Sequence, residues 1–130
     1  MSSVQSPRSV SSENAPGAIG PYSQGVVAGN LLFISGQLPV DPATGAFAAG
    51  GIAEHAHQCL KNLMAIAQAA GTTLERAVKV TVFLSDMGNF ATVNQVYGEY
   101  FRANLPARSA IQVAALPKNA DIEIEAIVSL

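Results

Sequence analysis

The hydrophobic pattern of this chain changes its period at Gly71, and that change limits the folds it can adopt. Residues 51–70 place their apolar side chains within a stripe of about 100°, which predicts an amphipathic helix. Residues 77–84 instead alternate, which predicts a strand with one buried face. Because a helix stripe and a sheet face must both be covered, we expect a layered fold. The buried side of this strand is expected to hold Val78, Val80, Val82 and Leu84.

The flanking segments continue the succession of strands and helices. Gly29-Asn30 separates two apolar segments, which is typical of a tight hairpin. Pro106 blocks continuation of the second helix, because proline lacks the N–H that a helix needs. The order is strand, strand, helix, strand, helix, strand, strand, which predicts an α+β domain with two helices packed on one face of a mixed β-sheet. The expected strands are 24–28, 31–35, 77–84, 109–114 and 121–130, and the expected helices are 51–70 and 90–103.

The length and the distribution of charge predict one domain that associates with copies of itself. The chain has 130 residues, enough for a single substantial core. Residues 1–13 are rich in serine and hold no apolar segment, so we expect a flexible N-terminal tail before one domain at 14–130. Only 12% of the residues are charged, and the strand at 31–35 is apolar on both faces. Both features predict that other subunits cover part of the surface.

Composition argues against several classes of function. The net charge is −2 and the seven Lys and Arg residues are scattered, which argues against nucleic acid as a ligand. No apolar run approaches the ~20 residues that span a bilayer, so we expect no membrane association. The lone Cys59 cannot form an internal disulfide, which favours a reducing compartment, and we expect a cytoplasmic protein.

His55-Ala56-His57 suggests a metal site at first sight. Residues two apart on a helix point about 200° away from each other and cannot share one ion. His55 and Cys59, four residues apart, can share one, but two ligands are too few for zinc. We therefore expect no metal. Cys59 lies at the centre of the apolar stripe, where we expect it to pack in the core.

Arg108 is the single charge in the mostly apolar segment 105–116. A guanidinium stays protonated and is costly to bury alone, so Arg108 pairs with an internal acid, reaches solvent or awaits an anionic ligand. Glu123 and Glu125 share one face of the last strand, either as solvated charges or with one carboxylate that orients or deprotonates water. Asn94 interrupts the apolar stripe of the second helix, where it either pins a loop or lines a pocket. The residue pattern leaves these alternatives open.

Five short motifs follow one another along the chain. They are Ala15-Pro16-Gly17-Ala18-Ile19-Gly20-Pro21-Tyr22-Ser23-Gln24-Gly25, Phe33-Ile34-Ser35-Gly36-Gln37, Phe90-Ala91-Thr92-Val93-Asn94, Pro106-Ala107-Arg108-Ser109 and Ile122-Glu123-Ile124-Glu125-Ala126. Together they resemble the Rid (YjgF) family. The resemblance implies a chorismate-mutase-like α+β fold and a homotrimer with active sites in clefts between subunits. It also implies hydrolysis of 2-imino acids (2-iminobutanoate, 2-iminopropanoate and its enamine tautomer 2-aminoacrylate) to 2-keto acids and ammonia, with no cofactor or metal.

The resemblance also implies roles for individual residues. Arg108 matches the arginine that grips the substrate carboxylate, and Glu123 matches the glutamate that positions the attacking water. Many members carry a cysteine two residues after the arginine, where this chain has Ala110, whose main-chain groups can still contact a ligand. The other matching substrate-binding positions are Tyr22, Ser35, Gly36 and Asn94.

Functions from two different classes remain open. The first is an imine and enamine deaminase, which is a hydrolase. The second is a non-catalytic protein that uses the same cleft to bind small acids, to act as a chaperone or to inhibit translation. Binding an acid needs only the cation, so the presence of both Arg108 and Glu123 favours catalysis. Deamination of a different enamine, such as an aminomuconate, is a third function within the same chemistry.

Overall fold

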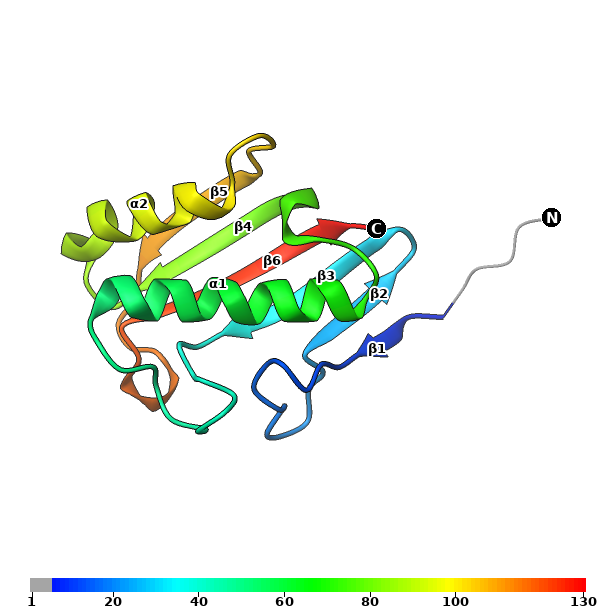
Figure 1. Ribbon diagram of the computed structural model, residues 1–130, viewed down its shortest axis with the longest axis horizontal. Helices are drawn as coiled ribbons and strands as arrows, with labels where there is room; N and C mark the ends of the chain where they lie inside the picture. The colour runs from blue at the N-terminus through cyan, green and yellow to red at the C-terminus, as the bar shows by residue number, and fades with distance from the viewer. Residues whose placement is uncertain (1–5) are drawn as a thin grey trace.

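The computed structural model describes residues 6–130 as two layers, a six-stranded sheet and two helices on one of its faces (Figure 1). The strands are β1 (Arg8–Val10), β2 (Gly25–Ala28), β3 (Leu31–Gln37), β4 (Ala77–Leu84), β5 (Ala107–Gln112) and β6 (Ile122–Ser129), and the helices are α1 (Ile52–Ala69) and α2 (Phe90–Tyr100). Across the sheet the strands follow the order β1-β2-β3-β6-β4-β5. This arrangement confirms the predicted α+β class.

Strand pairing places the last strand of the chain in the middle of the sheet. β4 and β5 are parallel, and the other neighbouring pairs are antiparallel. A parallel pair needs a crossover connection, which α2 supplies between β4 and β5. β6 pairs with β3 on one side and β4 on the other. Neither helix of the described residues is long and apolar enough to cross a membrane.

The hydrophobic core lies between the sheet and the helices, with α1 packed across β3 and β6 (Figure 1). The alternation within each strand sends every second side chain into this layer. Cys59 is fully buried there, which confirms its predicted place in the core. The buried side chains include Leu32, Ile34, Val80, Val82, Leu84, Ile122, Ile124, Ala126 and Val128 from the strands and Ala56, Cys59, Leu63 and Ile66 from α1.

The predicted limits agree best for the inner elements. β4 has the predicted bounds, and β6 is shorter than predicted by one residue at each end. α2 ends at Tyr100 instead of residue 103, because Phe101 takes an extended backbone and buries its ring. β5 begins two residues earlier than predicted, since Ala107 already pairs with Lys79 of β4.

Val78 corrects the predicted buried face of β4. Its side chain is 46% exposed, whereas Val80 and Val82 are buried. The pairing of β4 with β6 shifts between Ala77 and Lys79, so an irregularity in the ladder turns Val78 away from the core. Ala77 is buried instead.

Asn94 corrects the predicted stripe of α2. The helix buries Val93, Val96 and Tyr97, and Asn94 is exposed beside them. The true stripe is centred nearer Val96 than the sequence suggested, so Asn94 lies at its rim. There the Asn94 carboxamide accepts a hydrogen bond from Arg108.

The N-terminal segment is the third correction. Residues 1–13 were expected to form a flexible tail, yet Arg8–Val10 pair with β2 as an edge strand. Main-chain pairing does not require an apolar pattern in the pairing segment, and here it also buries Val10. Residues 1–5 of the expected tail lie outside the described residues.

The Gln24 side chain ties this N-terminal segment to the sheet. It is only 4% exposed, and its Oε1 atom accepts a hydrogen bond of 2.6 Å from the Ser12 N–H. Its Nε2 group donates to the carbonyl oxygens of Ser12 at 3.1 Å and Pro16 at 2.6 Å. One buried amide therefore satisfies main-chain groups that have left the strand ladder.

The sheet face opposite the helices is open in the single chain. Phe33 and Ile111 on this face are 41% and 44% exposed. The strand predicted at 31–35 is thus covered on one face only within one chain. Large apolar side chains exposed on an open sheet face are typical of a subunit contact, which stays a prediction.

We expect Gln24→Ala to lower the free energy of unfolding by about 1–3 kcal/mol, because it leaves partly buried main-chain groups without partners. Urea denaturation measures this loss. Gln68→Ala, which removes an exposed glutamine from α1, is the matched control and should change stability much less. Equal losses in the two variants would contradict the role given to the Gln24 amide.

Candidate active site

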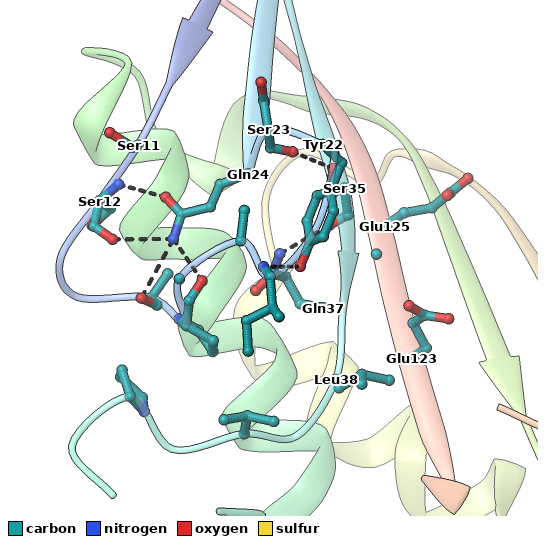
Figure 2. Close-up of a pocket in the computed structure, with 18 of the residues that line it drawn as sticks. Ser11, Ser12, Tyr22, Ser23, Gln24, Ser35, Gln37, Leu38, Glu123 and Glu125 are labelled. Atoms are coloured by element: carbon teal, nitrogen blue, oxygen red, sulfur yellow. Dashed lines mark hydrogen bonds between the residues drawn. The ribbon is translucent and has the colours of Figure 1, made fainter. Parts of the chain in front are cut away.

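A cavity of about 1480 Å³ opens where the N-terminal segment meets β3 and β6 (Figure 2). Its walls come from segments far apart in the sequence, which the sheet brings together. Four of the predicted site residues line it, namely Tyr22, Ser35, Gly36 and Glu123. Its other polar residues include Ser9, Ser11, Ser12, Ser23, Gln24, Gln37, Lys118 and Glu125.

Glu123 is the acidic residue of this cavity whose pKa is changed by its surroundings. It alternates along β6 with the buried Ile122 and Ile124, so its side chain lies on the face opposite the core. Glu125 projects to the same side of β6 (Figure 2). Burial raises the pKa of Glu123, and the charge of Glu125 raises it further. A carboxylate with a raised pKa accepts a proton more readily than an ordinary surface glutamate.

Gly36 makes room for the Glu123 carboxylate. A Cβ atom at position 36 would lie 2.5 Å from Oε2 of Glu123, much closer than real Cβ contacts allow. The pairing of β3 with β6 is irregular between Ile34 and Gln37, at the same point. Any side chain at position 36 would therefore displace Glu123 or the strand.

Ser35 and Tyr22 also line the cavity. The Ser35 hydroxyl donates a hydrogen bond of 2.6 Å to the carbonyl of Ser23, which joins β3 to the segment before β2. Tyr22 is 52% exposed, and its hydroxyl accepts from the Ile19 N–H at 3.4 Å. The Tyr22 ring therefore forms a side wall that a ligand can contact.

Two buried amides near the cavity escaped the sequence analysis. Gln37 is 5% exposed and donates to the carbonyl of Ser35 at 3.1 Å. Asn62 of α1 is fully buried and donates to the carbonyl of Val40 at 2.9 Å, which holds the loop after β3. For Asn62 the available signal was a polar residue next to an apolar helix stripe, but such a residue is usually solvated. Gln37 stood in one of the family motifs but was given no role.

Arg108 lies outside the cavity, on the edge strand β5. It reaches solvent and forms no ion pair with a carboxylate of residues 6–130. Its Nη1 group donates a hydrogen bond of 2.7 Å to Oδ1 of Asn94. Of the three predicted outcomes for this cation, an internal acid is excluded within the described chain. Ala110, two residues along β5, lies on the same side and is partly buried against the core.

The sheet places Arg108 and Glu123 on opposite faces. β4 pairs Val80 with Arg108 on one side and Phe83 with Glu123 on the other. Val80 points into the core under the helices, and Phe83, three residues later, points to the open face. The strands of Arg108 and Glu123 are also two strand spacings apart, roughly 9–10 Å. One chain therefore cannot bring both groups to one ligand of three or four carbons.

The histidines are engaged in contacts within the chain. His55 Nδ1 lies 2.8 Å from a carboxylate oxygen of Asp121, and its Nε2 lies 3.0 Å from the carbonyl oxygen of Ala48.

Burial raises the pKa of the Cys59 thiol well above its ordinary value. Within residues 6–130 no group of three or more His, Cys, Asp or Glu residues is arranged to hold a metal ion.

Glu123→Gln is expected to stabilise the folded protein at pH 7. Since the pKa of Glu123 is raised on folding, its ionised form opposes folding, and that cost appears as the pH rises through the folded pKa. The gain should shrink as the pH falls through the raised pKa of the folded state and should be absent below the ordinary carboxyl value of about 4.5. Urea denaturation at pH 7 and pH 4 measures the difference, with the exposed Glu75→Gln as control. A Glu123→Gln variant less stable than wild type at pH 7 would count against the inference.

Comparison with known proteins places the chain in a family. The family model described as Endoribonuclease L-PSP matches residues 12–130. The human 2-iminobutanoate/2-iminopropanoate deaminase is 52% identical over 120 residues, which are 92% of this chain and 88% of the human protein.

Solved structures agree with this match. The crystal structure of a Thermotoga maritima protein is 52% identical, has a TM-score of 0.92, and covers 95% of this chain and 97% of its own. E. coli TdcF, solved with bound serine, is 44% identical, has a TM-score of 0.90, and covers 95% of this chain and 98% of its own. The protein therefore belongs to the Endoribonuclease L-PSP family, the Rid (YjgF) family that its motifs resemble.

Proposed function

We propose that this protein is a hydrolase that deaminates reactive 2-imino acids and their enamine tautomers. Its substrates would be 2-iminobutanoate and 2-iminopropanoate or 2-aminoacrylate, and its products 2-keto acids and ammonia. The observation that supports this most is the Glu123 carboxylate, which faces the cavity with a raised pKa. The 52% identity to the human deaminase supports the same substrate class.

The proposed reaction uses a substrate that is already electrophilic. Arg108 would bind the substrate carboxylate through two parallel hydrogen bonds, which fixes the position of the iminium carbon. A water held by Glu123 would attack that carbon as Glu123 takes up its proton, giving a tetrahedral carbinolamine. Glu123 would return the proton to the nitrogen and the C–N bond would break. Ammonia would leave as the carbonyl forms, with the carbinolamine hydroxyl giving its proton to the Glu123 carboxylate. A general base of this kind contributes about 10²–10⁴-fold.

The active site is proposed to form between subunits. Arg108 and Glu123 lie on opposite faces of their own sheet, and the open face carries exposed apolar side chains. We propose a homotrimer, on the resemblance to the Rid family, in which Arg108, Asn94 and Ala110 of one subunit face Glu123 of the next. Ala110 would contribute its main-chain groups alone. A cytoplasmic location belongs to the same proposal.

Arg108→Ala should abolish the acceleration of keto-acid release, and Glu123→Gln should slow it by about 10²-fold or more. The assay couples a serine or threonine dehydratase to this protein and follows the release of pyruvate or 2-ketobutyrate. Exposed residues outside the cavity give matched controls, Arg102→Ala and Glu75→Gln, which should behave as wild type. If the two site variants release keto acid as fast as wild type, the hydrolase assignment is wrong.

Titration of pyruvate or 2-ketobutyrate separates catalysis from binding. An enzyme of the proposed kind binds these products, and Arg108→Ala should lose that binding while Glu123→Gln keeps it. Keto-acid binding that depends on Arg108 without any turnover by wild type would instead favour a non-catalytic binding protein.

Mixing the two inactive variants tests the site between subunits. Arg108→Ala subunits still supply Glu123, and Glu123→Gln subunits still supply Arg108. Random mixed trimers after refolding together should recover about a quarter of the wild-type sites, because one combination in four at each interface is intact. No recovery, with mixed trimers verified by mass spectrometry, would place both residues in one subunit and overturn the proposed assembly.

A further inference from the structure

The Arg108 guanidinium rests on one face of α2. Its Cζ atom lies 4.7 Å from the centroid of the Tyr97 ring and 5.3 Å from the centroid of the Phe90 ring. Its Nη1 group is hydrogen-bonded to Asn94 of the same helix. We call the Phe90 and Tyr97 rings the aromatic shelf. An exposed arginine on an edge strand normally samples many rotamers, so three contacts from one helix are a specific restraint.

The shelf is itself firmly held. Tyr97 is only 7% exposed, and its ring packs against Phe101 with centroids 4.5 Å apart. Burial raises the pKa of Tyr97 although Arg108 opposes that shift, so the ring is a neutral phenol at neutral pH. Its attraction for the guanidinium therefore comes from the π face of the ring.

The Tyr97 hydroxyl does not explain why tyrosine occupies this position. Its oxygen is buried and has no hydrogen-bond partner among residues 6–130. A buried hydroxyl without a partner costs stability and would ordinarily be replaced by the phenylalanine ring. The contact that Tyr97 makes with Arg108 is through the face of its ring.

We propose that the aromatic shelf positions Arg108, with Asn94 fixing one end of the guanidinium so that its remaining N–H groups point outward to a carboxylate. The shelf residues are thus positioning residues, which act on substrate only through Arg108. This inference rests on the proposed function, because the carboxylate to be bound is that of the 2-imino acid. Pre-ordering the fork removes part of the entropy that binding would otherwise cost.

The test measures the Kd of 2-ketobutyrate by calorimetry, together with kcat and KM in the coupled assay. Tyr97→Leu and Phe90→Leu each remove one ring and should raise Kd and KM about three- to tenfold with little change in kcat, since carboxylate binding is shared by ground and transition states. Tyr97→Phe keeps the ring and should retain the wild-type Kd. Tyr100→Leu removes another half-buried ring of α2 that does not contact Arg108, and it should leave Kd unchanged.

A double-mutant cycle separates positioning from a merely structural role. In the Arg108→Lys background, which keeps a cation that can bind the carboxylate but has no planar fork to orient, Tyr97→Leu should change Kd much less than it does with Arg108 present. Equal loss in both backgrounds, or wild-type Kd for both shelf variants, would overturn the inference. If Tyr97→Leu fails to fold, the partly exposed Phe90→Leu decides the matter through the same cycle.

The outcome is distinguishable from failure of the proposed function. If wild type binds 2-ketobutyrate through Arg108 but hydrolyses no imine, the deaminase proposal fails and the Kd values still test the shelf. If wild type binds no 2-keto acid, Arg108 has no carboxylate to meet and the inference fails as well.

Discussion

The alternation of side chains along β6 is the constraint on which the rest of the structure depends. β6 is bonded to β3 and β4, so both of its edges are occupied and its register is fixed. Its even-numbered positions, from Ile122 to Val128, fill the core under the helices, and Glu123 and Glu125 face the other way. A slip of one residue would bury two carboxylates and expose the apolar row. The hydrophobic energy of the core therefore also holds Glu123 in the cavity.

The same alternation divides the chemical groups between the two faces of the sheet. A single sheet with helices on one face can offer a carboxylate in its open cavity, but its edge arginine rests on the helix side. The two groups can approach one small ligand only when the edge of one molecule meets the open face of another. Assembly would then complete the site and would also cover the exposed side chains of Phe33 and Ile111.

What could be predicted from the sequence was what local patterns encode. Period two gave β4 and β6 almost to the residue, and the unusual charge of Arg108 marked it before any contact was known. The predictions that failed depended on partners distant in the chain. β1 exists because of its pairing with β2, and Val78 is exposed because of an irregularity in the pairing of β4 with β6. No local pattern in the sequence indicates the space that Gly36 leaves for Glu123. Gly36 was predicted as a site residue only through the family motif.

Burial of the Glu123 carboxylate lowers the stability of the fold and raises the pKa of that group. Glu123 packs where a side chain on Gly36 cannot fit, on a strand whose opposite face is fully buried, and there water solvates its carboxylate poorly. Folding alone would favour a neutral residue at this position. The large apolar core beneath β6 offsets the unfavourable burial of the charge, and the raised pKa that results is the property a general base requires. The raised pKa depends on the central place of β6, because an edge strand would let water solvate the carboxylate and restore its ordinary pKa.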